Sequence, residues 1–177
     1  MYKTYVLGIS LLLVAIFAVA AVPGLQMSAQ AQGVQYHSDV CVYKNDELID
    51  CSHNILYNTG KELIEDLLGD NTGTSADYIQ LCNATAGCGV PQADAGETYN
   101  ALNACGLAQA QGIYNGGLTG SGNWSISQTF QASCDNVQTN VTRLRTSGGT
   151  NFAGNNFTLV TLQTDDIVNV TWTIWVT

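Results

Sequence analysis

Six cysteines restrict the folds open to this chain more than any other feature. They are Cys41, Cys51, Cys82, Cys88, Cys105 and Cys134. An even number of cysteines behind an export signal indicates a set of disulfides. Zinc is the alternative, but there is no C-x-x-C pair, and His37 and His53 do not complete a finger spacing. We therefore expect three disulfides.

The first 31 residues have the pattern of a secretory signal. Lys3 precedes an apolar run over 6–22, Pro23-Gly24 interrupts the run, and Ala29-Gln30-Ala31 is a small-x-small cleavage pattern. Cleavage before Gln32 would leave 177 − 31 = 146 residues in an extracellular or cell-surface protein. The alternative is a retained hydrophobic helix, and only then would the chain contact a membrane.

The part after the signal is strongly acidic. All 14 Asp and Glu residues lie there, against Lys44, Lys61, Arg143 and Arg145, so its formal charge is 4 − 14 = −10. A surface of this charge stays soluble but repels phosphate backbones. Nucleic acid is therefore excluded as a partner.

The first predicted strand begins just after the cleavage site. Its apolar residues alternate with polar ones and share one face: Val34, Tyr36, Val40 and Val42. The next stretch is nearly symmetric about Asp46, and Asn45-Asp46 suits a tight hairpin turn. A hairpin would bring Cys41 and Cys51 face to face. The short Gly-containing loop favours Cys82–Cys88, which leaves Cys105–Cys134 by elimination.

One short helix is expected after the hairpin. Thr59 and Glu62 form a capping-box pattern, Gly69 ends the segment, and the apolar face consists of Leu63, Ile64, Leu67 and Leu68. The polar residues that follow resemble a calcium loop in composition, without the alternating acids of an EF-hand. Calcium, at Asp70, Asn71 and Asp77, is the one cofactor that this pattern suggests.

The rest of the chain reads as short strands and turns, with a possible helical turn over 99–105. Strands are expected near 78–81, 124–130, 137–144, 157–162 and 168–176. This pattern predicts a mainly β chain with a single jelly-roll-like β-sandwich domain and one short inserted helix. The expected divisions are 1–31 for the signal, 32–43 for the N-terminal strand and 44–177 for the sandwich.

Five N-x-S/T sequons occur in the exported part. Their acceptors are Asn83, Asn123, Asn140, Asn156 and Asn169. Asn123 and Asn169 fall on the polar faces of predicted strands, where an N-linked glycan would point to solvent. The alternative is that these residues form an ordinary polar β-surface.

No catalytic constellation stands out, so we do not expect an enzyme. Neither His37 nor His53 has a recognisable nucleophile or orienting group at a familiar spacing. The pair Asp165-Asp166 suits a turn before the last strand better than acid–base work. Trp124 and Trp172 are expected in the core, whereas Trp175 lies on the polar face and would meet a neighbouring element or a partner.

The order of these elements resembles subunits of archaeal extracellular filaments of the thread and bundling-pilus type. The resemblance covers the whole architecture: signal, N-terminal strand, stapled hairpin, one helix and a Gly/Asn/Thr-rich β domain with a strongly patterned C-terminal strand. It implies identical subunits that polymerise by donor-strand complementation. Segments such as Tyr78-Ile79 and 168–172 are also similar to small β proteins of virus-like surface structures.

Strand addition also has a physical basis. The segment from Gln32 to Val40 is alternating and has a free end after cleavage, so it could add to the open sheet edge of the next subunit. The donor residues would be Val34, Tyr36, Val40 and Val42. The alternatives are that this strand completes its own sheet, and that the chain is a monomeric or virion-associated surface glycoprotein that binds a glycan or a cell-surface partner.

Overall fold

The computed structural model describes residues 35–69, 73–94, 96–117 and 122–176, and 34–177 form one compact unit. The predictions made for the signal segment, Val34, Asp70 and Asn71 lie outside the described residues. No helix within the described ranges is long and apolar enough to cross a membrane.

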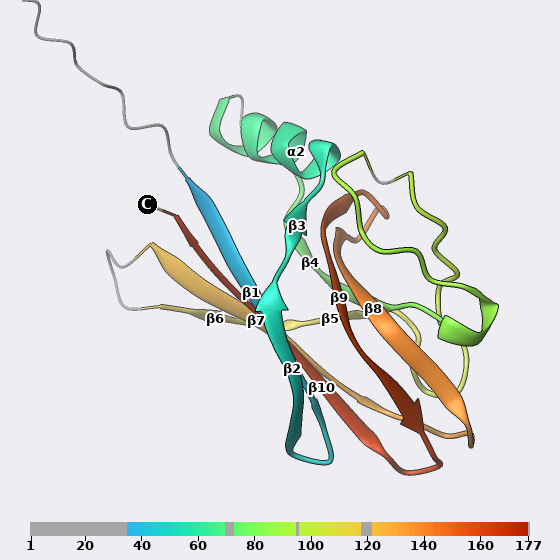
Figure 1. Ribbon diagram of the computed structural model, residues 1–177. Helices are drawn as coiled ribbons and strands as arrows, with labels where there is room; N and C mark the ends of the chain where they lie inside the picture. Colours follow the sequence, from blue (N-terminus) through green and yellow to red (C-terminus); the bar gives the residue numbers. More distant parts are fainter. Residues whose placement is uncertain (1–34, 70–72, 95, 118–121, 177) are drawn as a thin grey trace, which may run out of the picture. The chain divides into compact units, whose positions relative to one another are not determined.

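Ten strands form two antiparallel five-stranded sheets (Figure 1). Sheet A has the order β2-β1-β10-β7-β6 and consists of β1 (Tyr36–Lys44), β2 (Glu47–His53), β10 (Ile167–Val176), β7 (Asn123–Gln131) and β6 (Ile113–Gly116). Sheet B has the order β3-β9-β8-β4-β5 and consists of β3 (Ile55–Leu56), β9 (Asn151–Leu162), β8 (Val137–Thr146), β4 (Ala76–Leu81) and β5 (Ala110–Gln111). The prediction of a mainly β sandwich with one short helix is confirmed.

The core lies between the two sheets and is supplied by both. The last strand is its main contributor, because Val168, Val170, Trp172 and Ile174 are all buried as the alternation predicts. Sheet B adds side chains such as Leu144 and Leu162. Trp172 is fully buried, while Trp124 is only partly buried and packs against the same cluster.

The N-terminal hairpin and its disulfide form as predicted. Asn45 and Asp46 both have positive φ, 48° and 68°, which is the type I′ geometry that matches the twist of two strands. Cys41 lies directly opposite Cys51 in the register, with their Cα atoms 4.0 Å apart. The structure also pairs Cys82 with Cys88 and Cys105 with Cys134, as expected.

Helix α2 (Asn58–Gly69) begins one residue before the predicted capping residue. The capping box is wrong, because the Tyr57 carbonyl accepts the N–H of Lys61 at 3.1 Å and Thr59 therefore lies inside the first turn. The Thr59 hydroxyl donates to the backbone carbonyl of Asn151 in β9, 2.5 Å away. The predicted apolar face is confirmed in part: Leu63 is buried in the core, but Leu67 is exposed.

The segment after β4 differs from the prediction. A short 3-10 helix, η1 (Ala84–Ala86), follows β4, and the expected helical turn over 99–105 is absent from the described chain. Tyr99 and Ala101 are extended and form isolated bridges to Cys88 and Cys82. The Cys82–Cys88 disulfide closes the loop over 82–88 and holds its two ends together.

One continuous segment, 110–116, supplies an edge strand to each sheet. β5 pairs with β4 in sheet B, and after a single residue, Gly112, β6 pairs with β7 in sheet A. The Gly112 N–H donates to the carbonyl of Asp77, 2.7 Å away. A Cβ at this position would lie 2.5 Å from the Cγ2 of Ile126, so the crossing needs glycine.

Candidate functional site

The outer edge of β6 is the most exposed apolar feature of the described chain. All four residues of the strand are exposed, and Ile113 and Tyr114 are 73% and 64% accessible. The segment from Ala110 to Gly117 carries no charge and no proline. Charges, prolines and bulges are the usual means of protecting an edge strand from further pairing. β6 has none of these protections.

The opposite edge of sheet A is closed by side chains. The Asp50 carboxylate accepts the backbone N–H of Thr158 at 2.9 Å. The Asn155 amide donates to the backbone carbonyl of Ser52 at 3.2 Å. Both contacts join β2 to β9, and the second occupies a backbone carbonyl of β2 that an added strand would need. In sheet B, the edge strands β3 and β5 have two residues each, which is too short to guide a partner strand.

The free side of β6 is therefore the best candidate site for contact with another chain. We call its four residues, Ile113–Gly116, the β6 edge. On an edge strand the outward N–H and C=O groups can pair with an extended peptide, while exposed side chains select what binds. Because the site is made of backbone groups and apolar side chains, it suits binding rather than bond-breaking chemistry.

The N-terminal strand β1 is paired within the chain's own sheet. β1 lies between β2 and β10, in unbroken register with β10 from Tyr36–Val176 to Lys44–Val168. Val40 and Val42 are buried in the chain's own core. The donor role expected for Tyr36, Val40 and Val42 is thus corrected, since a strand paired on both sides has no free edge to give away. The chain adopts the alternative, in which β1 completes its own sheet.

The five sequon asparagines occupy different environments. Asn123 and Asn156 are exposed, and Asn169 is half-buried, donating to the Thr129 hydroxyl at 3.0 Å. Asn83 caps η1 by accepting the N–H of Thr85 at 3.1 Å. The Asn140 side-chain oxygen is buried and has no hydrogen-bond partner within the described chain. Exposure therefore favours Asn123 and Asn156 as glycan acceptors.

The two histidines lie on the outer face of sheet A. His53 pairs through Nδ1 with the Asp39 carboxylate, and His37 stacks on Trp175 with the ring centroids 5.6 Å apart and the planes 10° apart. Trp175 thus packs on a neighbouring strand, one of the two roles expected for it. Nowhere in the described ranges do three His, Cys, Asp or Glu residues gather in a group that could hold a metal ion.

Asp166 lies in the turn before the last strand, as expected, and its carboxylate connects this turn to the β1–β2 hairpin turn. Its carboxylate accepts the N–H of Gln163 and the amide of Asn45, and it pairs with Lys44 at 2.9 Å. The Gln163 N–H, followed by the contacts from Asn45 and Lys44, lowers the pKa of Asp166 to about 2. Asp165 has a φ of 70° in the turn and accepts from Gln131.

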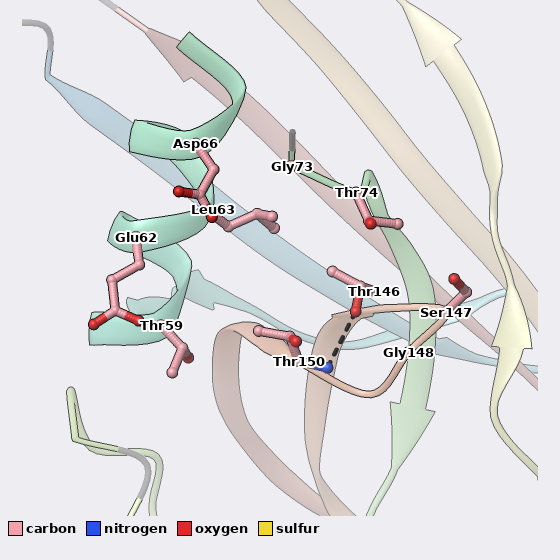
Figure 2. Close-up of a pocket in the computed structure, with 10 residues that line it drawn as sticks. All are labelled: Thr59, Glu62, Leu63, Asp66, Gly73, Thr74, Thr146, Ser147, Gly148 and Thr150. Carbon is pink, nitrogen blue, oxygen red and sulfur yellow. Dashed lines mark hydrogen bonds between the residues drawn. The ribbon is translucent and has the colours of Figure 1, made fainter. Parts of the chain in front are cut away.

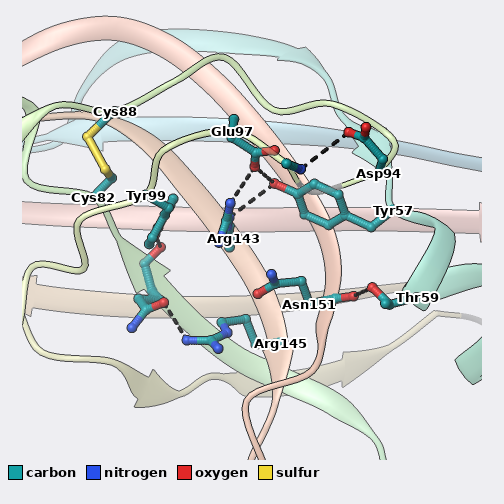
Figure 3. A network of polar contacts seen from close by, with 12 residues as sticks. Tyr57, Thr59, Cys82, Cys88, Asp94, Glu97, Tyr99, Arg143, Arg145 and Asn151 are labelled. Carbon is teal, nitrogen blue, oxygen red and sulfur yellow. Dashed lines mark hydrogen bonds and ion pairs between the residues drawn. A yellow bond between two sulfur atoms is a disulfide. The ribbon is translucent and has the colours of Figure 1, made fainter.

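A buried ion pair lies on the outer side of sheet B, and sequence reasoning missed it (Figure 3). Arg143 of β8 pairs with Glu97 of the loop, with side chains 7% and 2% exposed. The Tyr57 hydroxyl donates to Glu97 at 2.6 Å and accepts from Arg143 at 3.1 Å. Burial raises the pKa of Glu97, but the hydrogen bonds from Tyr57 and Arg143 outweigh it and leave that pKa below its ordinary value. The network fastens the loop to the sheet.

An open cleft of about 340 Å³ lies between α2 and the β8–β9 turn (Figure 2). Its lining is polar, with Glu62 and Asp66 on the helix side and Thr146, Ser147 and Thr150 on the turn side. Thr146 accepts the N–H of Thr150 at 3.1 Å, so its hydroxyl stabilises the turn. Asp77, the described member of the predicted calcium set, accepts from Gln111 at 2.8 Å and does not line this cleft.

Comparison of the chain with protein-family models, with curated proteins and with solved structures finds no match. The fold and the β6 edge therefore carry the functional argument. Three disulfides are compatible with an extracellular protein.

Proposed function

We propose that this chain is a structural subunit of an extracellular surface filament, in which copies associate by strand addition. The observation that carries the proposal is the uncharged and exposed β6 edge. The exported part has a formal charge of 4 − 14 = −10, so like-charged copies repel each other over most of their surface. An uncharged edge is the place where two copies can approach at the least electrostatic cost.

The added strand is the N-terminal segment of a neighbouring copy. Because β1 is committed to its own sheet from Tyr36 onward, the donor is the stretch before it, Gln32–Gln35. Signal cleavage before Gln32 would free this stretch. Its four residues equal the length of the β6 edge. The contact is head-to-tail, and a head-to-tail contact that does not close produces a filament.

The decisive test is microscopy of the purified chain after export. We expect filaments of uniform width in negative stain. Tyr114→Lys places a charge on the β6 edge and should leave monomers. Leu48→Lys is the matched control, because Leu48 is 53% exposed on β2, at the opposite edge of the same sheet, and this variant should still form filaments.

The donor is tested separately by shortening the N-terminus. Removal of residues 32–35 should abolish filaments and leave thermal stability unchanged, whereas a deletion that extends to residue 40 would remove half of β1 and unfold the domain. A protein that stays monomeric at high concentration, with all three disulfides intact, contradicts the proposal. The surface-glycoprotein alternative would then be tested on a glycan array.

A further inference from the structure

The outer face of sheet A brings a sequon and an aromatic side chain together. In the strand register, His37 of β1 lies opposite Trp175 of β10, and Trp175 lies opposite Asn123 of β7. The three side chains form one row on the same face, with Trp175 in the middle. Asn123 begins the sequon Asn123-Trp124-Ser125 and is exposed.

The stacking of His37 on Trp175 distinguishes the two faces of the indole ring. His37 lies nearly parallel to Trp175 and comes from the β1 side, so it covers the indole face toward β1. The other indole face is directed toward β7, where Asn123 lies. Directly opposed residues of an antiparallel pair have Cβ atoms about 4.5–5.5 Å apart, so a group on the Asn123 amide lies within reach of the ring.

The row beside Trp175 supplies polar partners. The next row on the same face lies two residues farther along the strands and contains one polar side chain from every strand of sheet A. These residues are His53, Asp39, Thr173, Ser125 and Asn115. The spacing between strands is about 4.8 Å, so these groups form a regular line across the sheet. Hydroxyl, amide and carboxylate groups are the donors and acceptors that sugar hydroxyls require.

We propose that an N-linked saccharide attached to Asn123 packs on the face of Trp175 opposite His37 and along this polar row. One face of a sugar ring is lined by C–H groups, which suits the negative face of an indole. The inference rests on the proposed export of the chain but not on strand addition. It makes Trp175 the platform for the chain's own glycan.

The other exposed sequon provides a matched control. Asn156 lies in β9, and its register partner is the aliphatic Val141. A glycan at Asn156 has no aromatic side chain directly across the strand. Any general effect of glycosylation on solubility or stability should therefore appear at both sites, whereas contact with Trp175 should appear at Asn123 alone.

The experiment uses the full chain secreted from an N-glycosylating host, with sequon occupancy mapped by peptide mass spectrometry. We expect Asn123 to carry a glycan. Asn123→Gln should increase the quenching of tryptophan fluorescence by acrylamide, because Trp175 becomes accessible while Trp172 stays buried. Asn156→Gln should leave the quenching unchanged. The same variants from a host without N-glycosylation should show no difference.

Thermal unfolding gives a second readout. Loss of the Asn123 glycan should lower the Tm by about 2–4 °C, as expected for an aromatic contact worth about 1 kcal/mol in a chain of this size. Trp175→Leu should remove that difference. An unoccupied Asn123, or equal quenching and Tm changes for Asn123→Gln and Asn156→Gln, would overturn the inference. Filament formation is scored independently by microscopy, so the two proposals fail separately.

Discussion

The guanidinium of Arg143 lies over the ring of Tyr99, with its central carbon 3.8 Å from the ring centroid. Arg143 belongs to β8, whereas Tyr99 belongs to the loop that follows η1. A cation held against an aromatic face away from water is a favourable contact. Together with the pairing to Glu97, this contact fixes part of a long loop that also places Leu102 and Leu107 in the core.

Removal of one partner of the buried ion pair should be costly. Glu97→Ala leaves the Arg143 charge buried and unpaired, and we expect a loss of about 3–5 kcal/mol in the free energy of unfolding. Chemical denaturation with a fluorescence readout measures this loss. Glu65→Ala, at an exposed position of α2, is the control and should change little. A loss below 1 kcal/mol for Glu97→Ala would contradict the structural role of the pair.

The low pKa of Asp166 predicts a specific acid response. Its pKa is about 2 in the folded chain, below the ordinary value of 3.8, so the carboxylate stabilises the fold above pH 4 and loses this effect as the pH falls toward 2. Urea midpoints of the unaltered chain and of Asp166→Asn should therefore differ at pH 7 and converge near pH 2. Asp46→Asn, in the exposed hairpin turn, is the control and should change the pH 7 midpoint less than Asp166→Asn does.

The crossing from β5 to β6 should tolerate no side chain. Gly112→Ala places a methyl group 2.5 Å from Ile126 and 3.1 Å from the Ser127 carbonyl. We expect a loss of about 1–3 kcal/mol, since overpacking forces the neighbouring strands to shift. Gly148→Ala serves as the control, because its nearest neighbour would be 3.8 Å away. Equal midpoints for the two variants would refute the close approach.

The three disulfides should differ in their access to a reductant. Cys51 is exposed on the outer face of sheet A, whereas Cys82 is fully buried. Mild reduction followed by alkylation and mass spectrometry should label Cys41 and Cys51 first and Cys82 and Cys88 last. Prior labelling of Cys82 would show that its loop opens before the hairpin does.

Local patterns predicted the parts of the fold that depend on neighbours in sequence. The hairpin followed from Asn45-Asp46, because two residues with positive φ turn a chain within its own span. The last strand followed from the alternation around Trp172. The Thr59 cap was predicted wrongly because the helix begins earlier, and the Thr59 hydroxyl instead donates to a carbonyl 92 residues away. A local sequence pattern cannot predict a partner as distant as Asn151.

The candidate site could be predicted only in part. The glycines and the absence of charge around Ile113 are visible in the sequence, but nothing there shows that β6 is an edge. That property depends on β7 being paired with β10 on its other side. The pairing of Arg143 with Glu97 is equally invisible, since it joins a strand to a loop 46 residues earlier.

The register of Tyr36 with Val176 has a mechanical consequence. The two ends of the described domain are neighbours on adjacent strands, so tension between them would peel β1 from β10 one residue pair at a time. Peeling needs little force, but it reaches Cys41 after five pairs. There the bond to Cys51 transfers the load to β2, which is anchored to β9. The Cys41–Cys51 disulfide thus limits how far the domain can be pulled open by its ends before the rest of its sheet resists.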